Sequence, residues 1–132
     1  MKKIVLLLIV IFFAACKSEK VNPNEIIITS KKQIIATDYS IKIDKVISDS
    51  RCPEGVNCIW AGELVMQLCV HQNNTIKETK IITFSPKTFE ENMIWFSQLL
   101  PEGKKLKQFK IETPKKDTPM ELKDYKIVLI LE

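Results

Sequence analysis

Apolar and polar residues alternate with a period of two along much of this chain, which is the pattern of half-buried β-strands. Residues 63–71 show the pattern most clearly, and there one face carries Leu64, Met66, Leu68 and Val70. Weaker alternation predicts further strands at residues 40–47, 75–84 and 107–112. Two short apolar runs, 26–29 and 34–37, flank the polar residues 30–33 and predict a β-hairpin.

The last apolar segment, residues 125–131, differs from the others. It begins at a tyrosine and is apolar on both faces over its second half. A short continuous apolar run of this kind is typical of a strand that is covered on both sides. We therefore expect the chain to end in a central strand.

One segment, residues 85–100, follows a helical period instead. An apolar stripe at helical spacing predicts a helix that packs into the core, and its members are Phe89, Met93, Phe96 and Leu100. Thr88 and Glu91 have the spacing of an N-terminal capping box. Residues 101–103 (Pro-Glu-Gly) would end the helix, and a strand through residues 94–96 is the alternative.

About seven short strands with one helix near residues 87–100 predict a mainly β fold, either an antiparallel β-sandwich or a small barrel. The chain contains only three glycines, so a glycine-rich phosphate-binding loop is not expected. No internal repeat is evident.

The N-terminus has the features of an export signal. Lys2 and Lys3 precede an unbroken apolar run from residue 4 to residue 15, which is too short to span a bilayer. Residues 13–16 (Phe-Ala-Ala-Cys) resemble a bacterial lipobox, which implies cleavage before Cys16 and acylation of Cys16 with diacylglycerol and palmitate-like chains.

This resemblance divides the chain into three parts. We expect a lipoprotein signal peptide at residues 1–15, a lipidated tether at 16–24 and a single β-sandwich domain at 25–132. A lysine, not an aspartate, follows Cys16, and by the same resemblance this favours the outer membrane. Whether the domain faces the periplasm or the cell surface stays open.

The charge balance argues against nucleic acid as a partner. The formal net charge is +4, and Lys2 and Lys3 of the signal segment contribute two of those charges. The other lysines include scattered pairs at 31–32, 104–105 and 115–116, whereas nucleic-acid binding needs a clustered basic face. The expected partners are the membrane, through the lipid, and an envelope protein.

Residues 49–63 (DSRCPEGVNCIWAGE) contain two of the four cysteines and two of the three glycines. In an exported chain, two cysteines six residues apart between strands predict a disulfide, here Cys52–Cys58. Residues 52–55 suit a type I turn that brings the two sulfurs together.

The residues around this disulfide also have expected roles. Asp49 and Ser50 are suited to accept hydrogen bonds from backbone amides, and Arg51 is expected to pair with Asp49 or Glu63. Trp60 is expected to pack on the disulfide or on the edge of the sandwich, and Gly62 to permit a bulge before the next strand.

The same stretch resembles a known motif. Residues 49–53 (Asp-Ser-Arg-Cys-Pro), then Val56, Cys58 and residues 60–63 (Trp-Ala-Gly-Glu), resemble a motif of small exported bacterial proteins and lipoproteins of unknown function. In those proteins the motif lies between two strands, and the chain often ends in a tyrosine-led apolar strand. The resemblance implies a location and an architecture, but no activity, and a helix at 85–100 departs from the commoner all-β layout.

Metal binding and catalysis find little support in the sequence. Cys69 and His71 project from one face of the strand at 63–71, and with Met66 or Met93 they are candidate ligands for copper. Their spacing matches no structural zinc motif, so we assign no metal and no cofactor. His71 is the only histidine and no nucleophile motif lies near it, so we expect no enzymatic activity. Pairing of Cys69 with Cys52, with Cys58 or with another protein stays open.

These observations lead to three hypotheses about function. The first is a non-catalytic binding or structural module of the cell envelope whose contact surface comprises Arg51, Glu54, Asn57 and Trp60. Alternatively, Arg51 forms a structural ion pair and Trp60 belongs to the core. The second hypothesis is a small inhibitor of a lytic enzyme such as a protease or lysozyme. The third is metal or redox handling through Cys69 and His71.

Overall fold

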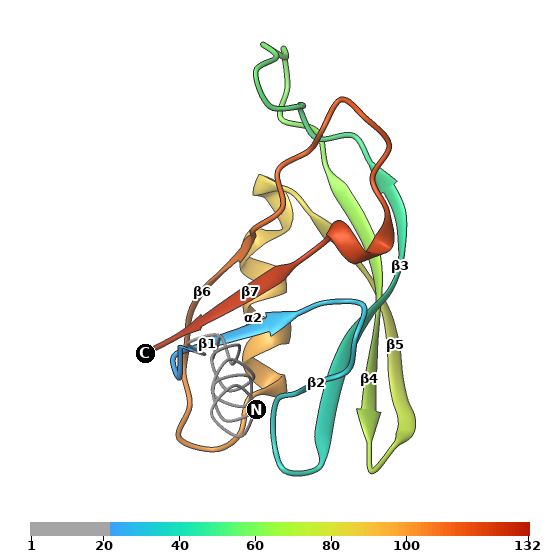
Figure 1. Cartoon of the computed structure of the whole chain (residues 1–132). Helices are drawn as coiled ribbons and strands as arrows, with labels where there is room; N and C mark the ends of the chain where they lie inside the picture. The colour runs from blue at the N-terminus through green and yellow to red at the C-terminus, as the bar shows by residue number, and fades with distance from the viewer. Residues whose placement is uncertain (1–21) are drawn as a thin grey trace, which may run out of the picture.

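The computed structural model describes residues 22–132, which form seven strands and one α-helix (Figure 1). The predicted signal peptide, Cys16 and most of the predicted tether lie outside the described residues. In chain order the elements are β1 (Glu25–Ile28), β2 (Gln33–Ile34), β3 (Tyr39–Asp49), β4 (Leu64–Gln72), β5 (Thr75–Phe84), a 3-10 turn (Pro86–Thr88), α2 (Phe89–Leu99), β6 (Leu106–Ile111), a second 3-10 turn (Leu122–Asp124) and β7 (Ile127–Leu131).

The strands form two antiparallel sheets that pack face to face. One sheet has the order β2-β3-β4-β5 and the other the order β1-β7-β6. Their inner faces share one hydrophobic core, to which Leu64, Met66, Leu68 and Val70 contribute from β4. The predicted face of β4 is therefore confirmed, and the fold is a β-sandwich and not a closed barrel.

The long strands β3, β4 and β5 lie close to their predicted positions. A two-residue turn at Asn73 and Asn74 joins β4 to β5, and both residues have positive φ, 49° and 64°. Tight β-hairpins need this conformation, and asparagine tolerates it better than most other residues. The turn thus fixes the register of the hairpin that carries Cys69 and His71.

The predicted hairpin between residues 26–29 and 34–37 is wrong. β1 pairs with β7 in one sheet, and β2 pairs with β3 in the other. The short connection between β1 and β2 crosses from one layer to the other, where the Ile43 amide donates a 2.7 Å hydrogen bond to the Thr29 carbonyl. Each of the two short apolar runs pairs with a longer strand from elsewhere in the chain and not with the other run. The local sequence pattern does not indicate which partner strand a short run will pair with.

The last strand, β7, is the centre of its sheet, as its apolar sequence predicted. It lies between β1 and β6, and Ile127, Val128 and Leu129 are each at most 1% exposed. Tyr125, just before the strand, is also buried. Its hydroxyl donates a hydrogen bond to Asp49 at the end of β3.

The helix α2 follows β5 and closes one side of the sandwich. Phe96 packs on Phe84 of β5 and Phe109 of β6, with ring centroids 6.4 and 5.4 Å away, and those two rings also contact each other at 5.7 Å. The buried Asn92 donates a 2.8 Å hydrogen bond from Nδ2 to the Thr83 carbonyl, which ties the helix to β5. The predicted helix is thus confirmed in place and extent.

Two details of the helix prediction are wrong. Met93, Phe96 and Leu100 of the predicted stripe do pack on the core. Phe89, however, lies at the rim, 37% exposed and stacked on Phe109, and Trp95, which is outside the stripe, is buried. The capping box uses Ser85 and Thr88 in place of Thr88 and Glu91. The preceding 3-10 turn places the Thr88 hydroxyl beside the Ser85 amide, which donates a 3.1 Å hydrogen bond to it. Thr88 is therefore the last residue of a capping box and not the first.

Candidate functional site

The connection between β3 and β4, residues 50–63, projects beyond the end of the sandwich (Figure 1). We call it the corner loop. Its two stems continue the pairing of the strands. The Ser50 amide donates to the Glu63 carbonyl at 2.9 Å, the Glu63 amide donates to Ser50 Oγ at 3.0 Å, and the Cys52 amide donates to the Ala61 carbonyl at 3.4 Å. These bonds hold the base of the loop in one shape.

Gly62 is required where the stems meet. It has a φ of +68°, and a Cβ at this position would lie 1.9 Å from the Ser50 carbonyl oxygen. Any other residue would therefore both strain the backbone and collide with the opposite stem. The bulge expected at Gly62 is not found, because the register of Asp49 and Leu64 continues through Ser50–Glu63 and Cys52–Ala61; Gly62 is needed there for its positive φ and for the close approach of the stems.

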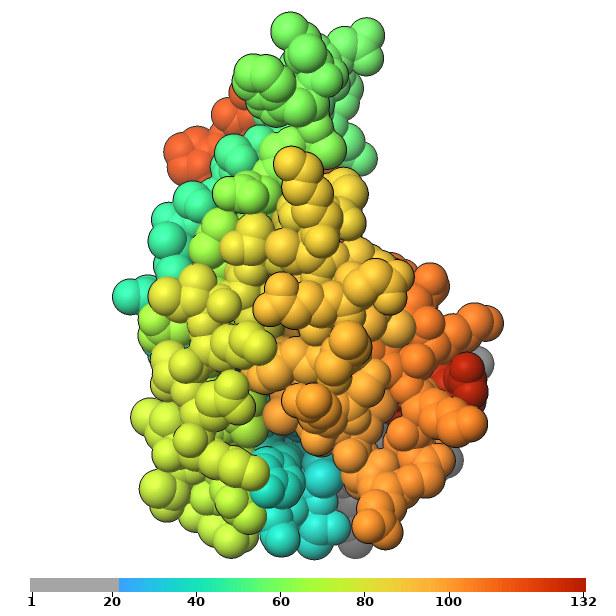
Figure 2. Space-filling model, turned by 180° about the vertical axis from the view of Figure 1, so that it is seen from behind, coloured from blue at the N-terminus to red at the C-terminus, as the bar shows by residue number. Residues whose placement is uncertain are grey.

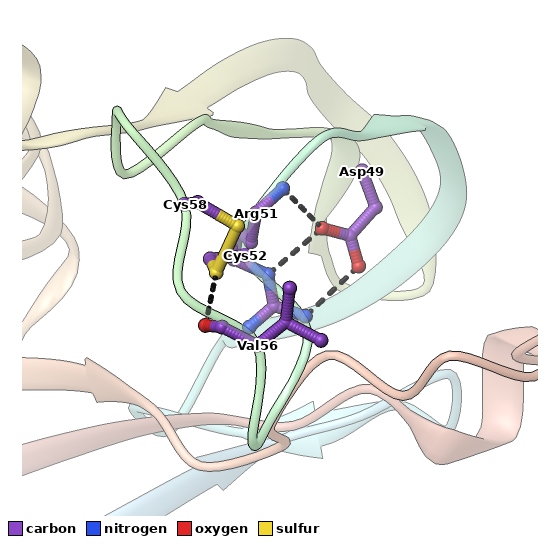
Figure 3. The surroundings of a disulfide bond; sticks show 5 residues. All are labelled: Asp49, Arg51, Cys52, Val56 and Cys58. Atoms are coloured by element: carbon purple, nitrogen blue, oxygen red, sulfur yellow. Dashed lines mark hydrogen bonds and ion pairs between the residues drawn. A yellow bond between two sulfur atoms is a disulfide. The ribbon is translucent and has the colours of Figure 1, made fainter.

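A disulfide between Cys52 and Cys58 closes the outer part of the corner loop, with the two Cα atoms 5.9 Å apart (Figure 3). The turn inside it lies one residue later than predicted. The Val56 amide donates to the Pro53 carbonyl at 3.2 Å, and Gly55 has a φ of +79°. Positive φ at the third position is typical of a type II turn, so the prediction of a type I turn at residues 52–55 is wrong.

Arg51 is a brace within the protein. Its Nε and Nη2 atoms each donate a 2.9 Å hydrogen bond to one carboxylate oxygen of Asp49 (Figure 3). The remaining Nη1 donates to the Thr113 carbonyl at 2.7 Å. The side chains of Arg51 and Asp49 are only 18% and 5% exposed. The alternative reading of Arg51, a structural ion pair with Asp49, is therefore the one that the structure shows.

The segment before β7 supports the corner loop from one side. The Thr113 carbonyl accepts from Arg51, and the Glu54 amide donates to the Lys115 carbonyl at 3.0 Å. The Tyr125 hydroxyl donates a 3.0 Å hydrogen bond to Asp49 Oδ2. The loop is thus held by its own stems, by a disulfide and by a neighbouring segment.

This network shifts two pKa values. Burial raises the pKa of Asp49, but the hydrogen bonds and positive charge of Arg51, together with the Tyr125 hydroxyl, outweigh burial and leave it below its ordinary value of 3.8. Burial, followed by the hydrogen bond to Asp49 and the charge of Asp49, raises the pKa of Tyr125 to about 12. Asp49 is accordingly a fixed anion at neutral pH, and Tyr125 a fixed donor.

The tip of the corner loop exposes three apolar side chains. Val56 is 49%, Ile59 96% and Trp60 78% exposed. The expectation that Trp60 packs on the disulfide or on the sandwich edge is wrong, because the stapled loop extends past the strands and leaves no layer for the indole to enter (Figure 2). Glu54 and Asn57, the other predicted surface residues, are exposed at the same tip.

Beside the loop lies a groove with a volume of about 420 Å³. Trp60 and Glu63 line it from the corner loop, and Pro86 and Lys87 from the 3-10 turn before α2. Ala61 and Gly62 also line this groove. Sequence reasoning missed Ile59 at the tip and Lys87 in the groove, because isoleucine in a β protein suggests core and Lys87 belongs to a separate segment.

Cys69 and His71 lie two positions apart on β4. Both side chains are buried, with exposed fractions of 4% for Cys69 and 5% for His71. The thiol lies 3.6 Å from the hydroxyl of Thr79 on β5. His71 Nδ1 is buried without a hydrogen-bond partner among residues 22–132. Burial, then the positive charges of Lys32 and Lys42, lower the pKa of His71 below 6.5, against an opposing effect of Asp44.

The structure does not extend this pair to a larger set of metal ligands. Within residues 22–132 no three His, Cys, Asp or Glu side chains are grouped so that they could hold a metal ion. Met66 lies in the core with Leu64 and Leu68, because odd and even residues of a strand point to opposite faces. It does not share the face of Cys69.

The fold and the site define a class of protein: a two-layer antiparallel β-sandwich that displays a rigid, disulfide-closed loop. Comparison with protein families, with characterised proteins and with solved structures finds no match to this chain. In the part of the chain that the structure describes, no helix has the length and apolar character needed to cross a bilayer.

Proposed function

We propose that this protein is a non-catalytic binding module of the bacterial cell envelope and that the tip of the corner loop is its contact surface. The observation that carries the proposal is the exposure of Val56, Ile59 and Trp60 on a loop that is fixed in shape. Exposed apolar side chains grouped on one protrusion are typical of interaction sites. Tryptophan is the residue most enriched among those that dominate binding energy.

The rigidity of the loop supports this role. Binding costs free energy whenever flexible side chains and loops must be ordered, so a preformed loop binds more tightly than a mobile one. Here the disulfide, the paired stems and the Arg51 brace have already ordered the loop before it meets a partner. In this proposal Arg51 supports the loop from inside the protein and does not contact the partner. Glu54 and Asn57 are exposed beside the apolar residues and belong to the contact surface.

We further propose that the module is an outer-membrane lipoprotein anchored through Cys16. The short apolar N-terminal run and the lipobox-like residues 13–16 support this. β1 begins near the C-terminus, at the side of the sandwich and away from the corner loop (Figure 1). An anchored domain with this layout presents the loop away from the bilayer that holds it.

A photo-crosslinking amino acid at residue 59 tests the contact surface in cells. We expect a defined crosslinked product from residue 59 and none from residue 121, which is exposed but belongs to another surface. The product should disappear in the Cys52→Ser/Cys58→Ser variant. Equal crosslinking from both positions would remove the corner loop as the specific surface.

The anchor has its own test. Labelled palmitate should be incorporated into the full chain and not into its Cys16→Ala variant, which should leave the membrane fraction. An unlabelled full chain would overturn the lipoprotein proposal and leave the binding surface untouched.

A second candidate, an inhibitor of a lytic enzyme, is favoured by the charge of the loop. Arg51 at the base of the corner loop is neutralised by Asp49, and the rest of the loop, residues 52–63, carries Glu54 and Glu63 and no lysine or arginine. Enzymes that attack anionic cell-wall polymers gain from a basic surface, which an acidic loop complements. A panel of lysozymes and proteases should include one enzyme that the protein inhibits near stoichiometry. The Ile59→Asp variant should not inhibit it, whereas Glu121→Ala should.

A further inference from the structure

The groove between the corner loop and the turn before α2 offers one aromatic wall and several polar groups. Trp60 forms the wall; its side chain is 78% exposed, and it lies between the disulfide-bonded Cys58 and Ala61, whose carbonyl accepts from the Cys52 amide. Gly62 has no side chain and Ala61 adds only a methyl group to the lining, so the groove stays open next to the indole. Figure 2 shows the corner loop standing beyond the segment that leads into α2.

The hydroxyl groups at the groove are already occupied. Ser50 Oγ donates to the Glu63 carbonyl at 3.2 Å and accepts from the Glu63 amide. Ser85 Oγ lies 3.2 Å from the Thr88 hydroxyl. Three polar side-chain ends at the groove have no hydrogen-bond or ion-pair partner among residues 22–132: the indole N–H of Trp60, the carboxylate of Glu63 and the ammonium of Lys87. The groove therefore offers two donors and one acceptor for a ligand.

The charges of these groups select among ligands. Glu63 and Lys87 cancel, so the groove has no net charge to attract a polyanion or a polycation. An uncharged ligand with an apolar face and groups that both donate and accept hydrogen bonds is the best match. A sugar ring has these properties, because its axial C–H groups form an apolar face and its hydroxyls donate and accept.

We propose that this groove binds a saccharide chain. The C–H face of one ring stacks on Trp60, since the face of an aromatic ring is electron-rich and C–H groups carry partial positive charge. Lys87 donates to a ring hydroxyl or to an amide carbonyl, and Glu63 accepts from a hydroxyl. The volume of about 420 Å³ falls in the range of ordinary small-ligand sites.

This site goes beyond the proposed function, because Val56 and Ile59 do not line the groove. Trp60 is the one residue that both sites use. Protein recognition at the tip depends on Ile59, whereas saccharide binding depends on Glu63 and Lys87. The two proposals can therefore fail separately.

The test is an NMR titration of the ¹⁵N-labelled domain with chitotetraose and with cellotetraose. The two sugars distinguish a requirement for N-acetyl groups from binding of a plain glucan, and either response supports the site. We expect the indole N–H resonance of Trp60 to shift and that of the buried Trp95 to stay unchanged. Because the groove is shallow and open, the dissociation constant should be on the order of 1 mM.

Variants then locate the binding. Trp60→Ala should raise the dissociation constant about tenfold or more, whereas Trp60→Phe, which keeps an aromatic face, should raise it much less. Lys87→Ala and Glu63→Gln should each weaken binding severalfold. Ile59→Ala, a matched change on the same loop, should leave it unaltered.

Two results would overturn the proposal. One is the absence of any Trp60 shift with both sugars at tens of millimolar. The other is binding that Ile59→Ala weakens as much as Lys87→Ala does, which would place the ligand at the tip. An anionic control, polygalacturonate, should bind no better than the neutral sugars, and clearly stronger binding would contradict the charge argument.

Discussion

Arg51 and Asp49 form a forked pair in which two parallel hydrogen bonds, both 2.9 Å long, join the guanidinium to the carboxylate. The pair connects the end of β3 to the first residues of the corner loop, and a third bond from Arg51 reaches the Thr113 carbonyl. Two residues only two positions apart in the sequence thus join the loop to a segment that comes much later in the chain.

Removal of Arg51 should destabilise the protein. Arg51→Ala removes the positive partner of the Asp49 carboxylate, which is 5% exposed and keeps the hydrogen bond from the Tyr125 hydroxyl, and breaking a buried ion pair in this way costs about 3 kcal/mol of unfolding free energy. The matched control is Lys123→Ala, which breaks an ion pair of 2.7 Å whose side chains are 73% and 70% exposed. That change should cost less than about 1 kcal/mol. Urea denaturation of both variants measures the difference, and equal losses would mean that Arg51 is not a brace.

The lowered pKa of Asp49 predicts a loss of stability in acid. A carboxylate whose folded pKa lies below its unfolded value of 3.8 contributes stability above pH 3.8, and this is lost as pH falls through the folded pKa. The unfolding free energy of the wild type should therefore fall more steeply below pH 4 than that of Asp49→Asn. Glu121→Gln, an exposed control, should keep the wild-type slope. Parallel curves for wild type and Asp49→Asn would contradict this prediction.

The longer strands were predictable because a period of two persists over many residues. β4 and β5 span nine and ten residues, which is long enough for the alternation of apolar and polar residues to mark their positions in the sequence. β2 has only two residues, and its pattern contains no information about which sheet it joins. The hairpin prediction failed for this reason.

The candidate site was predictable only in part. The disulfide was predicted from the expected export signal and from the cysteine spacing, and both are local properties of the sequence. The exposure of Trp60 is not local, because it depends on how far the stapled loop projects past the sandwich. The groove joins the corner loop to the turn at Lys87, and no motif links these two segments in the sequence.

His71 predicts a second pH dependence, nearer neutrality. Burial and the charges of Lys32 and Lys42 lower its folded pKa, so the unfolded chain binds a proton first as pH falls below 6.5. Stability should therefore be constant above about pH 7 and decrease as the pH falls below 6.5 toward the lowered pKa of folded His71. In His71→Gln this decrease should vanish. Thermal melts across this range measure it, and a variant that still loses the same stability would show that His71 is not responsible.

The two tryptophans should respond in opposite ways. Trp60→Ser should change the unfolding free energy by no more than about 0.5 kcal/mol, because the side chain is 78% exposed. Trp95→Ala should cost about 3 kcal/mol or more, because that indole is 7% exposed and packs on Phe96 at 5.1 Å. Acrylamide should quench the fluorescence of Trp60 and spare that of Trp95. A strongly destabilised Trp60→Ser variant would mean that the indole packs in the core after all.

Gly62 and Gly55 allow backbone strain to be separated from steric collision. Both have positive φ, +68° and +79°, so alanine at either position costs about 1 kcal/mol of strain. Only Gly62 has a neighbour in the way, since its Cβ would lie 1.9 Å from the Ser50 carbonyl oxygen, whereas Gly55 has nothing within 4 Å. Gly62→Ala should therefore cost clearly more than Gly55→Ala, by about 2 kcal/mol, because the paired stems must separate. Chemical denaturation gives both values. Equal costs would show that the stems yield without loss, and the corner loop would then be less rigid than its hydrogen bonds imply.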